Sequence, residues 1–158
     1  MPTHEAVTLE AFDRLHSTLR ESIALAEQER ESLRHLEVTA LLSAAAARAS
    51  LVERLGQQLA SGHSALASLS QACGADGTLA GLERQNPEIG ARVRTAVERA
   101  KAAARDLNRA DTFNHALARS ASRLLRGMAS RLPARGRSYD GAGAAAPLPP
   151  LATRSTTA

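Results

Sequence analysis

Side chains that could perform catalysis or bind a metal are few and widely spaced in this sequence. The five histidines stand at positions 4, 16, 35, 63 and 115, and none is three or four residues from another histidine or from the single cysteine. Helix-borne metal sites place two ligands one turn apart, so this spacing argues against such a site. The run Ser61–Ser64 holds a hydroxyl and an imidazole, but it lies in a helical pattern with no acid to orient the histidine. We therefore expect no catalytic residue, no metal and no other cofactor, and a protein that is not an enzyme and has no small-molecule substrate.

The composition indicates an all-α protein of one domain. Of the 158 residues 44% are hydrophobic, but only 2% are aromatic and tryptophan is absent. Ala and Leu supply most of the apolar surface, which favours elongated helix-on-helix packing. The lone thiol of Cys73 excludes an internal disulfide and suits a reducing compartment. Because the chain opens without a signal-like segment and has no apolar run of about 18–20 residues, we expect a cytoplasmic protein without membrane insertion.

The spacing of apolar residues predicts three long helices, over residues of about 5–36, 38–72 and 87–132. The first carries a stripe at intervals of three and four that includes Leu9, Phe12, Leu15 and Leu19. The second follows almost at once, and the sequence leaves open whether the two helices are continuous. Adjacent β-branched residues make the run 37–39 the favoured break.

The third helix has the clearest start and the longest apolar seam. Its opening, Asn86-Pro87-Glu88, combines a favoured N-cap residue, a proline at the first helical position and an acid. From Ile89 to Met128 the seam alternates intervals of four and three without a slip, for more than five heptads. About 45 residues at roughly 1.5 Å each span nearly 70 Å, so this helix must pack along another. We expect residues 1–132 to form an elongated antiparallel three-helix bundle or coiled coil, followed by a disordered Pro/Ala/Gly-rich tail over 133–158.

Asn114 is a polar residue in this otherwise apolar seam. A buried asparagine is costly unless its amide is hydrogen-bonded. One interpretation is a residue that sets the register of the helices or lies exposed at the edge of the seam. The other is that Asn114 supplies hydrogen bonds to a partner helix that docks there.

Charge is unevenly distributed along the chain. Residues 1–91 carry 7 basic and 12 acidic groups, whereas residues 92–137 carry 12 basic and 3 acidic groups. This pattern indicates either an acidic helix paired with a basic one or a basic arm for nucleic acid. Nucleic acid is disfavoured, because no aromatic residue is interleaved and no known DNA-binding module is present. The residues that could contact phosphates are Arg119, Arg123, Arg126, Arg131, Arg135 and Arg137.

The order of these features resembles the FlgN family of flagellar export chaperones over most of residues 5–143. In that family the third helix carries an Asn-Gly…Leu motif and a Leu-Leu-rich stretch, and a Tyr-centred, Gly-containing segment lies in a flexible tail. His115 stands where the family usually has glycine. The segments that carry the resemblance are Glu29–Arg34, Leu107–Leu117, Leu124–Gly127 and Arg137–Gly141.

The resemblance implies a cytoplasmic chaperone that binds the amphipathic terminal helices of hook-associated proteins and delivers them to the type III export gate. Tyr139, the only tyrosine, corresponds to the position implicated in docking to that gate. The free protein would be a monomer or a homodimer. Two other functions stay open: a coiled-coil structural or adaptor protein with another partner and, less favoured, a basic nucleic-acid-associated protein. The residues for which we expect client contact are Asn114, Leu117, Ala121, Leu124 and Met128.

Overall fold

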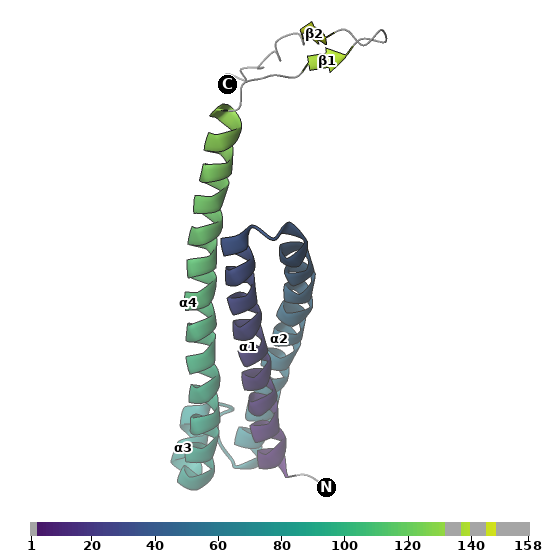
Figure 1. Cartoon of the computed structure of the whole chain (residues 1–158). Coiled ribbons are helices and arrows are strands. Elements are labelled where there is room, and N and C mark those ends of the chain that lie inside the picture. The colour runs from purple at the N-terminus through teal and green to yellow at the C-terminus, as the bar shows by residue number, and fades with distance from the viewer. Residues whose placement is uncertain (1–2, 132–136, 140–144, 148–158) are drawn as a thin grey trace, which may run out of the picture. The chain divides into compact units, whose positions relative to one another are not determined.

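The computed structural model describes residues 3–131, 137–139 and 145–147, with side chains as far as Met128. The elements are α1 (His4–His35), α2 (Val38–Ala72), α3 (Leu79–Gln85) and α4 (Pro87–Arg131), then β1 (Arg137–Tyr139) and β2 (Ala145–Pro147) (Figure 1). The chain divides into two compact units, Met1–Ala121 and Ser122–Ala158. The two strands pair antiparallel, with Tyr139 opposite Ala145. Most of the predicted disordered tail, 133–158, lies outside the described residues.

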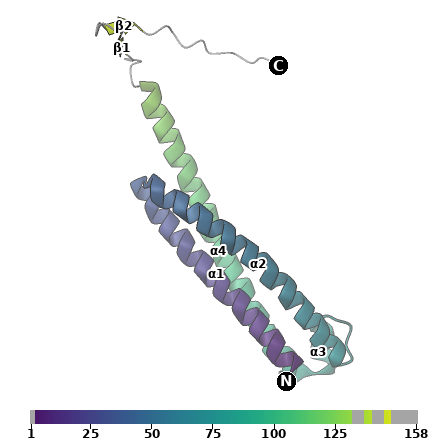
Figure 2. The same cartoon turned by 90° about the vertical axis from the view of Figure 1, so that its right-hand side faces the viewer.

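The first unit is a helical bundle. Within it α1 and α4 run in the same direction, and α2 runs in the opposite one (Figure 1, Figure 2). α1 supplies large side chains to the core, whereas α4 supplies mostly alanines, so the backbone of α4 can approach α1 closely. The predicted all-α, antiparallel three-helix bundle is thus confirmed, with α3 as an additional short helix. The core consists of Phe12, Leu15, Leu19, Ile23, Leu69, Leu82, Val93, Ala96, Ala100 and Ala103.

α1 and α2 are separate helices joined by a tight turn. Leu36 adopts a left-handed conformation with φ of 56°. The Glu37 N–H, directly after Leu36, donates to the Ser32 carbonyl at 2.9 Å. This hydrogen bond across a left-handed residue is a common way to end a helix. Glycine is the usual residue at such a position. The β-branched Val38 lies inside α2, so the break falls slightly earlier than the sequence indicated.

We expect Leu36→Gly to raise the free energy of unfolding by about 0.5–1 kcal/mol. A left-handed conformation costs a residue with a Cβ roughly 1–2 kcal/mol, and the loss of a half-exposed leucine side chain offsets part of the relief. Urea denaturation followed by circular dichroism measures the change. Leu36→Ala is the matched control, because it removes the side chain but keeps the Cβ. Stabilisation by Ala equal to that by Gly would contradict the explanation.

A hydrogen-bonded turn holds α3 against the end of α2. The Ser70 hydroxyl accepts from the Gly77 N–H at 3.1 Å and donates to the Thr78 carbonyl at 3.2 Å. Thr78 caps α3 by accepting from the Gly81 N–H at 2.9 Å. Its own hydroxyl donates to Asp76 at 2.5 Å, and this hydrogen bond is the main reason that the pKa of Asp76 lies below its usual value. The turn therefore fixes where α3 begins.

α4 begins as the sequence predicts. The Asn86 side chain accepts from the Ile89 N–H at 3.2 Å, and Pro87 occupies the first position of the helix. The first turn of α4 also lies very close to α3. A Cβ placed on Gly90 would be 2.7 Å from the Glu83 Cα, so only glycine fits at this crossing.

Gly90→Ala should lower the free energy of unfolding by about 1–3 kcal/mol. Alanine normally stabilises a helix interior relative to glycine by roughly 1 kcal/mol, but here its Cβ meets backbone that cannot rotate away. Thermal denaturation of the two proteins gives the comparison. For Gly127→Ala, where a Cβ meets nothing within 4 Å, we expect an unchanged or slightly higher melting temperature. A stabilising Gly90→Ala would show that α3 is not packed as described.

Candidate functional site

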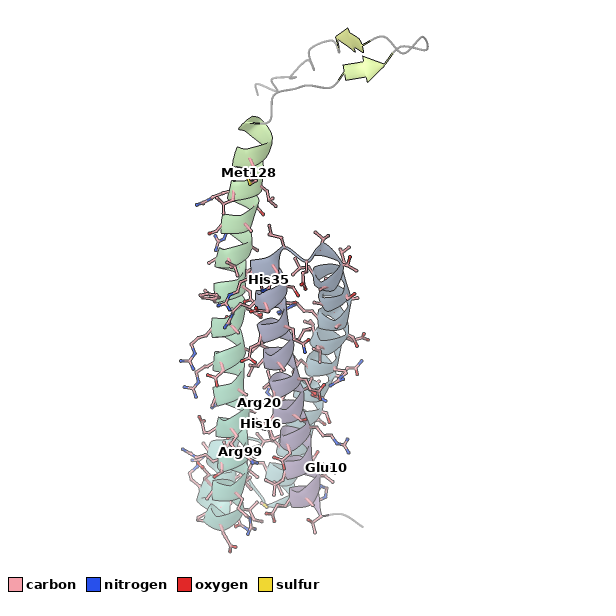
Figure 3. The ribbon with its side chains drawn as sticks, viewed as in Figure 1. Glu10, His16, Arg20, His35, Arg99 and Met128 are labelled. Atoms are coloured by element: carbon pink, nitrogen blue, oxygen red, sulfur yellow. The ribbon has the colours of Figure 1, made fainter. Side chains whose placement is uncertain are left out.

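The apolar seam of α4 changes from buried to exposed along its length. Val93 is fully buried, and from there to Asn114 every seam residue is buried except Leu107, which is partly buried. Leu117 and Ala121 are partly buried. The side chains of Leu124 and Met128 are 69% and 65% exposed, and Figure 3 shows Met128 on the last part of α4. The predicted seam therefore has an inner part covered within the bundle and an outer part open to solvent.

Asn114 lies at the inner end of the open part and is bonded to α1. Its side-chain N–H donates to the Ala26 carbonyl at 2.6 Å, and its side-chain oxygen accepts from the Arg30 Nε at 3.3 Å. The guanidinium of Arg30 also lies 4.6 Å above the centre of the Phe113 ring. Asn114 is thus 6% exposed, and both polar atoms of its amide are hydrogen-bonded to α1. This arrangement matches the register-setting interpretation of the sequence.

Acidic side chains of α1 pair with arginines of α4, as one interpretation of the charge pattern predicts. Asp13 accepts from Arg99 at 2.6 Å, and Glu5 pairs with Arg92 at 2.7 Å; Arg99 is labelled in Figure 3. The Arg99–Asp13 pair is exposed and the Arg92–Glu5 pair is partly exposed, so each contributes little to stability. They give Arg92 and Arg99 acidic partners within the protein.

Arg48 of α2 joins all three long helices. It forms a paired contact with Glu29 of α1, and its Nη1 donates to Asp111 of α4 at 2.8 Å. Hydrogen bonds to Glu29, and then to Asp111, raise the pKa of Arg48 above its ordinary value. A hollow of about 210 Å³ opens beside this contact. It is lined by Glu29, Leu33, Leu41, Arg48, Asp111, Asn114 and His115.

The open part of α4 has more apolar surface than the seam alone predicts. Leu125 is 51% exposed, although it is not a seam residue, and Phe113, just before the open part, is also 51% exposed. In the sequence, the pair Leu124-Leu125 was the one feature that could have pointed to Leu125 as an exposed apolar residue. Leu124, Leu125 and Met128 are therefore large apolar side chains that α4 leaves open to solvent.

Tyr139, the predicted docking residue, belongs to β1. Its side chain lies outside the described part of the structure, so its contacts are not defined. Among the residues with described side chains, no three His, Cys, Asp or Glu come together as they would around a metal ion. In the described part of the chain, no helix is long and apolar enough to cross a membrane.

A helical bundle with a partly open apolar seam is typical of proteins that bind the helices of other proteins. Comparison with known families makes the class specific. The chain matches the family model described as "FlgN protein" over residues 1–147, and it belongs to the FlgN family. FlgN proteins are flagellar export chaperones, not enzymes, and as chaperones they act on protein clients. No curated protein and no solved structure matches the chain.

Proposed function

We propose that this protein is a cytosolic flagellar export chaperone that binds the amphipathic terminal helices of hook-associated proteins and delivers them to the type III export gate. Membership of the FlgN family supports the chaperone role. The observation that carries the client site is the exposure of Leu124 and Met128 on a seam whose earlier residues are buried. A client helix would continue, along the outer part of α4, the kind of packing that α1 provides along the inner part.

The residues proposed for client contact are Leu117, Ala121, Leu124 and Met128. Leucine and methionine side chains supply adaptable apolar contacts, and alanine lets a second helix come close. Asn114, which we also predicted to touch the client, is bonded to α1. In this proposal Asn114 sets the register at the inner end of the face, because contact with a client would require its amide to leave α1.

The test is a pull-down of the full chain with the C-terminal helices of hook-associated proteins and with the full-length clients. Binding at micromolar concentrations supports the proposal, and failure of both probes refutes it. Tyr139→Ala, assayed in parallel, should bind clients normally but deliver them poorly to the export gate. Loss of client binding in that variant would contradict the division of roles between α4 and the tail.

The basic nucleic-acid-associated alternative has a separate test. Arg119, Arg123 and Arg126 are exposed, and the hydrogen bonds described for Arg119 and Arg126 go to backbone carbonyls of α4. Electrostatic binding to DNA would fall steeply with salt concentration. Salt-sensitive retention on DNA without any client binding would favour this alternative over the chaperone.

A further inference from the structure

A second apolar seam runs along the outside of α2. Its positions alternate intervals of four and three over more than three heptads, which is the pattern of a coiled coil. Every one of these residues is exposed, and the exposed fraction reaches 69% at Leu42 and 61% at Val52. The inner side of α2, with Ala44, Gly62 and Leu69, is the side buried in the bundle. The outer seam consists of Val38, Leu42, Ala45, Ala49, Val52, Gly56, Leu59 and His63.

The outward surface of α2 is almost uncharged. α1 carries eleven Asp, Glu and Arg residues, whereas α2, which is longer, carries only Arg48, Glu53 and Arg54. Arg48 pairs with Glu29 and Asp111 inside the bundle, and the exposed Arg54 is neutralised by Glu21 of α1. A solvated helix face normally carries charges, so a long neutral apolar face indicates a surface that another helix covers.

We propose that this surface binds α2 of a second copy of the chain, and that the two α2 helices run antiparallel. An interface around a two-fold axis must be complementary to itself, because both copies present the same patch. The outer seam meets this condition when Leu42 of one copy faces Leu59 of the other. Ala45 then faces Gly56, and Ala49 faces Val52. Near the centre each contact includes at least one alanine or glycine, so the helices can approach closely there, and a leucine pair closes each side.

A parallel pairing fits the same seam less well. It would set Gly56 against Gly56 between layers of larger residues and leave a void there, and voids in a helix interface cost stability. It would also bring the two His63 side chains together. The antiparallel register spreads large and small side chains more evenly over the layers.

An apolar hollow continues the seam toward the rest of the bundle. Gly56, Leu59 and His63 line its edge, and Phe12, Leu15 and Val97 are among the residues that form the rest of it. Its volume is about 340 Å³, and it is open to solvent. A helix docked on the outer seam would also cover this opening, which adds apolar area to the contact.

The pairing of Leu42 with Leu59 allows a test by reciprocal substitution, with no client present. At roughly 100 µM, a micromolar association gives mostly dimer, so light scattering after size exclusion should report twice the 16.6 kDa chain mass. Leu42→Glu alone and Leu59→Lys alone should each weaken association at least about tenfold, because a charge faces a leucine at two places in each dimer. Mixed in equal amounts, the two variants should form a heterodimer again, since the glutamate of one copy then faces the lysine of the other.

Controls separate this effect from misfolding and from unspecific charge effects. Ser43→Glu and Ser50→Lys place the same charges on exposed positions of α2 outside the seam and should leave the dimer intact. Circular dichroism should show unchanged helix content in all four variants. A monomeric wild type, or loss of the dimer in the controls, overturns the proposal. Two monomeric variants that do not recombine overturn the antiparallel pairing. None of these outcomes depends on client binding, so the chaperone proposal stands or falls separately.

Discussion

Replacing Leu124 with glutamate is expected to weaken binding of a client's terminal helix by roughly 10–100-fold. Burial of a leucine side chain contributes about 1.5–3 kcal/mol, and a carboxylate in the same place must also lose its water. Because Leu124 is 69% exposed in the free protein, the substitution should leave the bundle intact. Isothermal titration calorimetry with the C-terminal helix of a hook-associated protein gives the affinity, and thermal denaturation checks the fold.

Ser122→Glu is the matched control for this prediction. Ser122 is exposed on the same helix and stands two residues before Leu124, which places it on the opposite face. Its effect on client affinity should be less than about threefold, since an exposed charge outside the contact changes binding by a few tenths of a kcal/mol. Equal losses for both variants would mean that the acid acts through overall charge. An unchanged client affinity of the Leu124→Glu variant would show that the exposed part of the α4 seam is not the client site.

Asn114→Ala is expected to lower the free energy of unfolding by about 1–3 kcal/mol. The amide makes two hydrogen bonds to α1 at a site that is 6% exposed, and truncation leaves a buried Ala26 carbonyl and Arg30 without this partner. Urea denaturation measures the loss. Asn108→Ala, an exposed asparagine of the same helix, should change the stability by less than about 0.5 kcal/mol.

The same variant separates the two interpretations of Asn114. If the residue only sets the register, the folded Asn114→Ala protein should bind the client helix with nearly the wild-type affinity. A tenfold loss of affinity at a temperature where the variant is fully folded would instead support direct client contact. An unchanged stability would contradict the hydrogen bonds to α1.

The main helices could be predicted because their signals are local. The Asn86-Pro87 start of α4 depends on groups within a few residues, and the structure shows the predicted cap at 3.2 Å. The break between α1 and α2 was harder to place. It is set by Leu36, whose side chain gives no sign of the left-handed conformation that a glycine would have announced.

The proposed client face on α4 could be predicted only in part. The heptad seam identified Leu117, Leu124 and Met128, because periodicity shows which residues share a face. Periodicity cannot show where the covering helix stops, so the change from buried to exposed after Asn114 had to come from the structure. The same limit applies to α2, where the packing of the helices decides which apolar residues face inward and which face outward.

By itself the sequence determined the all-α class, the long α4 seam and the resemblance to the FlgN family, since composition, periodicity and short motifs are properties of the chain. The tertiary structure decided which apolar residues are covered, which partner Asn114 bonds to, and which side of α2 faces outward. Those properties depend on contacts between residues far apart in the sequence, such as Asn114 with Ala26 and Arg48 with Asp111. A helix has the same periodicity whether or not a neighbour covers it, so burial is fixed only when the helices pack.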